Sequence, residues 1–247
     1  MKLLLINPNT TESMTGRMLE MSRAMVRPST EVAAVTGRFG ARYVASRASY
    51  AIAGHAALDA YAEYGADADA VALACFGDPA LWALKEIARQ PVVGMAEASC
   101  LMAAAYGGKF AIVTGGERWG PMLREFVASI GLGDRLAAVV TVAPTGADIA
   151  RDPNAALALL RDTCRGCAND HGASSVILGG AGLAGIASRI SEAVPVPVID
   201  SLAACVGMAE AIALAGAGKA HVGSFAATPA VETIGLPSAL AALMAGR

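Results

Sequence analysis

Cys75 is the residue of this 247-residue chain whose setting most favours chemistry. It follows the apolar run Val71–Ala74 and begins the loop that continues through Phe76 and Gly77 to Pro79. Free backbone N–H groups at a strand end, together with the start of a helix, can lower a thiol pKa toward neutrality. Such a thiol can accept and return a proton at carbon, or attack a carbonyl. We therefore predict that Cys75 is catalytic, although cysteine is also a common buried apolar residue.

Four short polar or glycine-rich loops follow apolar runs and lead into helical patterns, namely residues 7–11, 75–79, 114–119 and 179–182. Ligands of open parallel sheets bind at the carboxyl ends of the strands, where N–H groups at helix starts attract anions and oxyanions. The alternative is that these loops are only helix caps and turns. The candidate substrate-binding residues are Asn7, Asn9, Phe76, Gly77, Asp78, Thr114, Gly115, Gly116, Gly180, Ala181 and Gly182.

The chain repeats itself with a period of about 106 residues. The matched segments are 2–6 with 109–113, 71–75 with 176–180, and 91–94 with 197–200. This alignment sets Cys75 against Gly180. A duplicated α/β unit tends to bring its matching loops face to face. We therefore expect the loops of Cys75 and Gly180 to face each other, with a thiol on one side only.

Short apolar runs alternate with longer amphipathic stretches, which predicts βαβ units and parallel sheets. The expected strands are 2–6, 31–35, 70–74, 92–94, 110–114, 136–141, 175–178, 196–199 and 220–222. The expected helices are 11–23, 46–64, 80–88, 96–105, 120–130, 153–171, 181–194, 201–213 and 237–245.

Composition limits the partners of the protein. The net charge is −2 with scattered basic residues, which argues against nucleic acid. No apolar run is long enough for a membrane span, and the run before Asn7 is too short for a signal peptide. A mean hydropathy of +0.50 favours further burial in a subunit interface. We expect a cytoplasmic homo-oligomer that acts on a small molecule.

The remaining cysteines and the histidines do not form a pattern that predicts a metal site. Cys164 and Cys167 form a CxxC inside a helical pattern, with no second pair nearby to complete a tetrahedral site. Cys100 and Cys205 lie on apolar helix faces. The histidines have no second ligand at metal spacing: His55, His171 and His221.

Several motifs together resemble the aspartate/glutamate/hydantoin racemase superfamily, with the greatest similarity to its hydantoin and allantoin racemase branch. These motifs are Asn7-Pro8-Asn9-Thr10-Thr11, Gly40-Ala41-Arg42-Tyr43, Ala74-Cys75-Phe76-Gly77-Asp78-Pro79, Gly94-Met95-Ala96-Glu97-Ala98 and Leu178-Gly179-Gly180-Ala181-Gly182. The resemblance runs from residue 2 to about 213.

The resemblance implies two pseudosymmetric flavodoxin-like lobes with parallel sheets, an active site in the cleft between them, and no cofactor or metal. It implies a first lobe of residues 1–97 with about 214–247, and a second lobe of 98–213. Family racemases place one cysteine on each face of the substrate. Here the first role falls on Cys75, and the second falls on Gly180, which has no proton to give.

We therefore expect a cofactor-independent racemase or isomerase that acts beside a carboxylate or carbonyl of a small acid, hydantoin or cyclic amide. Glu117 or water could supply the missing acid. Two alternatives remain: a cysteine-dependent decarboxylase or amide hydrolase on the same scaffold, and a small-acid binding protein without activity.

Overall fold

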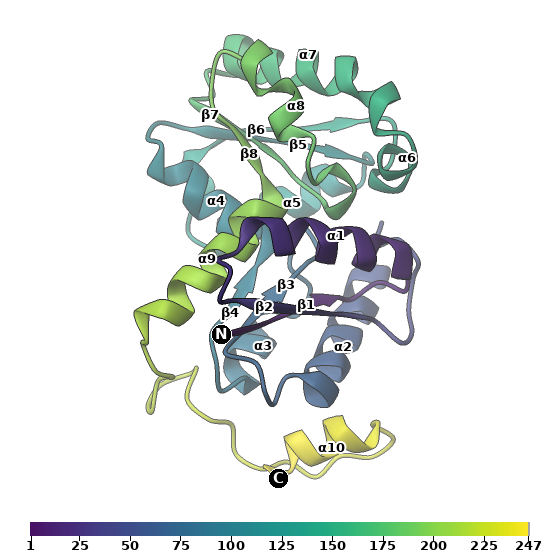
Figure 1. Cartoon of the computed structure of the whole chain (residues 1–247), viewed down its shortest axis with the longest axis vertical. Helices are drawn as coiled ribbons and strands as arrows, with labels where there is room; N and C mark the ends of the chain where they lie inside the picture. The colour runs from purple at the N-terminus through teal and green to yellow at the C-terminus, as the bar shows by residue number, and fades with distance from the viewer. Residues whose placement is uncertain (247) are drawn as a thin grey trace.

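The computed structural model describes residues 1–246 as two stacked α/β lobes, each with a four-stranded parallel sheet (Figure 1). The first sheet has the order β2-β1-β3-β4, and the second has the matching order β6-β5-β7-β8. The strands are β1 Lys2–Asn7, β2 Glu31–Thr36, β3 Ala70–Leu73, β4 Val92–Gly94, β5 Phe110–Gly115, β6 Leu136–Val142, β7 Ser175–Leu178 and β8 Val198–Asp200. The predicted α/β fold with two parallel-sheet lobes is confirmed, and the repeated strand order carries the sequence duplication into three dimensions.

The central strands are apolar along their whole length because helices cover both faces of each sheet. All four residues of β3 and of β7 are buried, as are all six of β5. In the first sheet, α1 and α9 cover one face, while α2 and α3 cover the other. In the second sheet, α4 and α5 cover one face, while α7 and α8 cover the other. The helices are α1 Glu12–Met25, α2 Arg47–Tyr64, α3 Leu81–Ile87, α4 Met95–Ala105, α5 Trp119–Ser129, α6 Gly146–Arg151, α7 Pro153–His171, α8 Ala187–Ile190, α9 Ser201–Ala215 and α10 Ser238–Met244.

The lobes exchange one helix each. Helix α4 follows β4 of the first sheet but packs on β7 and β8, and α9 follows β8 but packs on β3 and β4. The two helices also pack against each other between the lobes. The lobe boundaries at residues 97 and 213 stay a prediction. At α4 and α9, a boundary drawn by position along the chain differs from one drawn by the sheet on which the helix packs.

Three expectations about local structure were wrong. Residues 181–194 do not form one helix but a 3-10 turn (Ala181–Leu183), α8 and a second 3-10 turn (Ser191–Ala193). Gly185, at a φ of +83°, breaks the helical pattern. Residues 220–222 are not a strand, and α6 was not predicted.

The segment after α9 returns to the first lobe, where α10 packs on α2 (Figure 1). The Lys219 ammonium donates to the carbonyls of Lys85, Glu86 and Ala88 at the end of α3, which satisfies acceptors that a helix leaves unpaired. In the described part of the chain, no helix has the length and apolarity that crossing a bilayer requires.

Candidate active site

The carboxyl ends of the two sheets share one small cavity of about 40 Å³ between the lobes. Loops after β1, β2 and β3 contribute residues from the first lobe, and segments after β5, β6 and β7 contribute residues from the second. Among the described residues, no side chain that lines the cavity carries a formal charge at neutral pH. The lining residues are Asn9, Met14, Tyr43, Val44, Ala74, Cys75, Phe76, Thr114, Trp119, Gly146, Gly179, Gly180, Ala181, Gly182 and Leu183.

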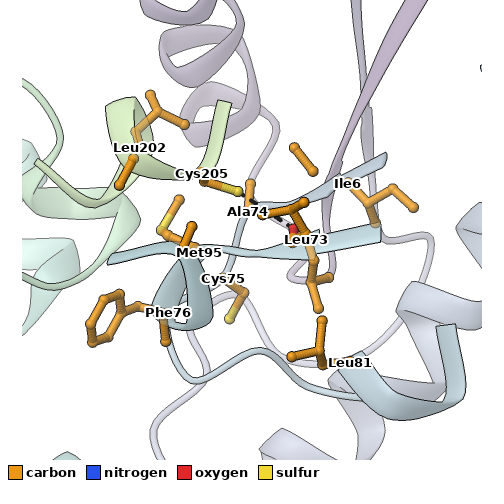
Figure 2. Close-up of a cluster of buried hydrophobic side chains, with 14 of the residues drawn as sticks. Ile6, Leu73, Ala74, Cys75, Phe76, Leu81, Met95, Leu202 and Cys205 are labelled. Carbon is orange, nitrogen blue, oxygen red and sulfur yellow. Dashed lines mark hydrogen bonds between the residues drawn. The ribbon is translucent and has the colours of Figure 1, made fainter. Parts of the chain in front are cut away.

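Cys75 lies at the wall of this cavity, where β3 has just ended. Figure 2 shows its side chain near those of Phe76, Leu81 and Met95, which belong to the same buried cluster. Cys75 is 8% exposed to solvent. Burial raises the pKa of the Cys75 thiol to about 12, and the nearby Asp78 carboxylate adds to the rise. The expectation of a pKa lowered toward neutrality was therefore wrong, because no cation or helix N-terminus outweighs the loss of water.

Asp78 holds the loop after Cys75 against the start of α4. Its two carboxylate oxygens accept the N–H groups of Ala96 and Glu97, both at 2.8 Å. These bonds lower the pKa of Asp78, but complete burial outweighs them and raises that pKa to about 8. Gly94 provides the space, since a Cβ there would lie 2.1 Å from an Asp78 oxygen. Asp78 is thus a cap for α4 and does not line the cavity.

Gly77 lets the same loop turn beneath an indole ring. Its φ is +105°, and a Cβ would lie 2.6 Å from the Trp119 ring. The Tyr50 hydroxyl donates to the Gly77 carbonyl at 2.7 Å and fixes the turn from α2. Gly77 therefore shapes the loop without lining the cavity.

Asn7 and Asn9 have different positions after β1. Asn7 is fully buried, and its amide donates to Asn9 at 3.0 Å and to Thr15 at 2.9 Å. Asn9 lines the cavity; its oxygen accepts the Thr11 N–H, while its amide nitrogen contacts only the Met14 sulfur. Asn9 can therefore donate to a ligand, and Asn7 positions it.

The second-lobe side of the cavity is made of close backbone contacts. Thr114 donates its hydroxyl to the Gly179 carbonyl at 2.7 Å. A Cβ on Gly179 would lie 2.4 Å from the Phe76 ring, so only glycine allows the lobes to meet here. A Cβ on Gly182 would lie 1.9 Å from the Gly146 carbonyl oxygen. These close approaches bring the backbone of the second lobe directly to the cavity.

Gly180 stands where the repeat aligns it with Cys75, and it lines the cavity. Its φ of +133° belongs to a region that residues with a Cβ rarely adopt. Its N–H donates to the Ser201 hydroxyl at 3.2 Å, so it does not point at a ligand. Ala181 begins the 3-10 turn, and its N–H has no helical acceptor. Ala181 is therefore a free donor of this loop, whereas Gly180 is not.

Tyr43 joins the two lobes across the cavity. It lies after β2 in the first lobe, but its hydroxyl accepts the Gly146 N–H at 3.1 Å and donates to the Gly115 carbonyl at 3.4 Å. Burial raises its pKa. In the sequence, Tyr43 stood out only as part of the Gly40-Ala41-Arg42-Tyr43 motif. Its partner Gly146 begins α6, the helix that was not predicted.

The structure brings together seven of the predicted site residues and separates the other five. Those on the cavity are Asn9, Cys75, Phe76, Thr114, Gly180, Ala181 and Gly182. Those outside its lining are Asn7, Gly77, Asp78, Gly115 and Gly116. Sequence reasoning did not single out Met14, Val44, Trp119, Gly146 and Leu183, which carry no polar side chain except the indole N–H.

Glu117 is exposed and lies outside the lining of the cavity. Among residues 1–246, no group of three or more His, Cys, Asp or Glu side chains is arranged to hold a metal ion.

A larger groove of about 500 Å³ lies beside the cavity, between α3 and α5. Trp119 lines both spaces, and Gly77 and Asp78 line the groove. The Arg47–Glu125 ion pair, which also lines the groove, connects the two lobes there. The Cys75 loop thus separates an outer groove from an inner cavity.

Comparison with known proteins agrees with this geometry. Residues 3–221 match the Asp/Glu/Hydantoin racemase family. The hydantoin racemase of Pseudomonas sp. (strain NS671) is 32% identical over 213 residues, 86% of each chain. That of Paenarthrobacter aurescens is 32% identical over 87% of this chain and 92% of the relative. The chain belongs to this family and is an isomerase of the racemase type.

The fold of the chain is similar to the solved structures of two allantoin racemases. The enzyme from Pseudomonas fluorescens superposes with a TM-score of 0.91 at 29% identity, covering 95% of this chain and 100% of the other. The enzyme from Klebsiella pneumoniae gives 0.89 at 30% identity, with 97% and 98% covered. Arylmalonate decarboxylase shares the fold, with a TM-score of 0.63 at 18% identity over 88% and 94% of the two chains.

Proposed function

We propose that this protein racemises a neutral hydantoin-type cyclic amide at the carbon next to a ring carbonyl, with Cys75 as the first proton carrier. The observation that carries the proposal is the thiol of Cys75 on an interlobe cavity without a charged lining residue. The hydantoin and allantoin racemases among the relatives support the same substrate class.

The lining favours a neutral ring over a charged amino acid or malonate. A carboxylate taken out of water requires a cation or several hydrogen-bond donors in compensation. The cavity offers only neutral donors, among them the Asn9 amide and the Ala181 N–H. A cyclic amide needs a few such donors on its carbonyls and ring N–H groups, and its apolar remainder suits Met14, Phe76 and Leu183.

The reaction would begin when the Cys75 thiolate removes the proton from the carbon beside the carbonyl. The electron pair of the broken C–H bond moves into the ring, and the carbonyl oxygen takes the negative charge of an enolate. Donors fixed near that oxygen stabilise the charge as it develops. We assign this role to the Ala181 N–H and the Asn9 amide. Return of a proton to the opposite face completes the inversion.

The raised pKa of Cys75 makes its thiolate a strong base but a minor species at neutral pH. The base is present only when the thiol has lost its proton, so its fraction increases as the pH rises toward about 12. We therefore expect the rate of proton removal to increase with pH through the neutral and mildly alkaline range.

The cavity of about 40 Å³ is little larger than the share of one water molecule in the liquid, about 30 Å³. A five-membered ring with a substituent needs more space. Substrate entry therefore requires that the loops of the two lobes move apart, and Tyr43 and Trp119 are the large side chains that such a movement displaces.

The test incubates single enantiomers of 5-substituted hydantoins, allantoin, aspartate, glutamate and malonates with the protein in D₂O. NMR follows deuterium at the carbon beside the carbonyl, and chiral chromatography follows inversion. We expect deuterium and inversion in a hydantoin-type substrate, and we expect inversion to fall at least about a thousandfold in Cys75→Ser. A Cys164→Ser variant, in α7 and away from the cavity, serves as the control for a removed buried thiol.

Other results of the same experiment would contradict the proposal. Loss of carbon dioxide from a malonate indicates a decarboxylase, and ring opening by water indicates an amide hydrolase. Binding without exchange, unchanged in Cys75→Ser, indicates a binding protein. Inversion of aspartate or glutamate alone would refute the neutral substrate class.

A further inference from the structure

The proposed racemisation needs a second proton carrier, since Gly180 has no side chain and its N–H is bonded to Ser201. Besides the thiol of Cys75, the described lining residues offer two hydroxyl groups, those of Tyr43 and Thr114. Tyr43 and Thr114 are therefore the two candidates for the second proton carrier.

Thr114 lies close to the missing thiol but has unsuitable chemistry. Its oxygen is 3.8 Å from the position that a Cβ of Gly180 would take. Its proton is donated to the Gly179 carbonyl at 2.7 Å. An aliphatic hydroxyl ionises far less readily than a thiol or a phenol, whose ordinary pKa values of about 8.5 and 10 lie near each other. Thr114 can hold a hydrogen bond, whereas a phenol can exchange a proton with carbon.

Tyr43 brings such a phenol to the second-lobe side of the cavity. Its oxygen is 3.1 Å from the Gly146 nitrogen and 3.4 Å from the Gly115 carbonyl oxygen, and both partners belong to the second lobe. The carbonyl of Gly146 in turn contacts Gly182, which follows Gly180 by two residues. The phenol thus lies against the loop that would carry a second cysteine, while Cys75 extends from the first lobe.

Resting on the proposed function, we propose that the Tyr43 hydroxyl is the second proton carrier and replaces the thiol that is missing at Gly180. The Cys75 thiolate takes the proton from one face of the ring carbon and becomes a thiol. The Tyr43 O–H bond breaks, its proton forms the new C–H bond on the other face, and a phenolate remains. The opposite enantiomer reacts in reverse, with the phenolate as base and the thiol as acid.

Two contacts suit this role. The Gly146 N–H points at the Tyr43 oxygen and stabilises the phenolate after proton transfer. The bond to the Gly115 carbonyl is long, so little is lost when the hydroxyl turns to a substrate. Burial raises the pKa of Tyr43, as it raises that of Cys75.

The decisive variant is Tyr43→Phe, which removes one oxygen and keeps the ring. Exchange with D₂O and inversion are measured separately for each enantiomer of the hydantoin that the wild type accepts. We expect inversion to fall at least about a hundredfold in both directions. Exchange without inversion should persist for the enantiomer whose proton faces Cys75. In Cys75→Ser, exchange should persist instead for the other enantiomer.

Tyr61→Phe is the matched control. The Tyr61 hydroxyl also accepts a backbone N–H, from Arg89 at 3.3 Å, and donates to a carbonyl oxygen, that of the Gln90 side chain at 3.2 Å. It lies near the end of α2, beside the residues that precede β4, and so at the opposite edge of the sheet from the cavity. We expect this variant to invert the substrate at the wild-type rate.

If Tyr43→Phe does not fold, fluorotyrosine at position 43 gives a second test. Fluorine lowers the phenol pKa without removing the hydroxyl. Its expected effect is a shift of the pH profile for phenolate-dependent exchange to lower pH, with Cys75-dependent exchange unchanged. An unshifted profile would contradict the proposal.

The outcomes distinguish the two proposals. Inversion by Tyr43→Phe within a few fold of the wild type refutes the role of Tyr43 and leaves the racemase function standing. Equal loss of exchange for both enantiomers also refutes it, because it indicates a structural role. A wild-type protein that exchanges no hydantoin refutes the proposed function and this inference together.

Discussion

In each lobe, one aspartate links a loop at the cavity to the start of a helix. In the first lobe the aspartate belongs to the loop, and in the second it lies at the start of the helix. In the first lobe Asp78 belongs to the loop after β3 and reaches the N–H groups of Ala96 and Glu97 in α4. In the second lobe Asp200 precedes α9. It accepts the N–H groups of Leu202 and Ala203, and reaches back to the Gly185 N–H at 2.6 Å.

The difference shows that both copies of a duplicated unit can keep a loop-to-helix link by hydrogen bonds, even though the aspartate that makes it occupies a different position in each copy. In the first lobe the carboxylate lies three residues from Cys75, is buried, and contributes to the raised thiol pKa. In the second lobe Asp200 occupies the place that Gly94 holds in the first. The loop with Gly180 is thus fixed without a carboxylate of its own, so the two loops differ in the position of the aspartate as well as in the thiol.

The largest expected effect concerns the thiol of Cys75, in the loop that contains Asp78. Because the pKa of Cys75 is about 12, its thiolate fraction should increase about tenfold per pH unit from pH 7 to pH 10. Alkylation by iodoacetamide, followed at Cys75 by peptide mass spectrometry, should increase in the same proportion. Asp78→Asn removes the negative charge that Asp78 carries above about pH 8, so alkylation above that pH should be faster than in the wild type. A plateau below pH 9 in the wild type would show a thiol that is not raised by burial.

The next effect compares the two aspartates. Asp78→Ala leaves two buried N–H groups of α4 without an acceptor and should cost about 2–3 kcal/mol of the free energy of unfolding. Asp200→Ala should cost about 1 kcal/mol, since Asp200 is half-buried and water can replace its oxygens. Urea denaturation followed by circular dichroism measures both values. Equal losses would show that burial does not distinguish the two connections.

The smallest effect concerns the glycine opposite Cys75. Gly180→Ala has space for its methyl group, with the nearest atom 3.5 Å away, but its φ of +133° should cost about 1–3 kcal/mol. Gly207→Ala, at an exposed position inside α9 with nothing within 4 Å, is the control. It should stabilise the protein by up to about 1 kcal/mol. A stabilised Gly180→Ala would show that the backbone at Gly180 does not require glycine.

Much of the fold followed from local patterns. Strands such as Ala70–Leu73 and Ser175–Leu178 are continuous apolar runs, because both faces of each sheet are covered. The segment 181–194 did not follow, since its apolar content suits a helix while Gly182 and Gly185 meet requirements set by other parts of the chain. Gly182 is required by the Gly146 carbonyl of α6, a contact that no local pattern reveals.

The candidate site was predicted in part. Strand ends pointed to Asn9, Cys75 and Thr114, because the carboxyl edge of a parallel sheet is a general place for ligands. The same rule wrongly included Asp78, which caps a helix that begins 17 residues later in the chain, at Met95. Tyr43 was only weakly indicated, because its role depends on a contact across the lobes with Gly146.

The sequence alone determined the duplication, the parallel sheets and the loss of a second cysteine at Gly180, because these depend on residue type and spacing along the chain. The tertiary structure decided the protonation of Cys75, the destination of Asp78 and the proximity of Tyr43 to the second lobe. Burial and contacts between distant segments set these properties, since desolvation and hydrogen bonding depend on every group that surrounds an atom.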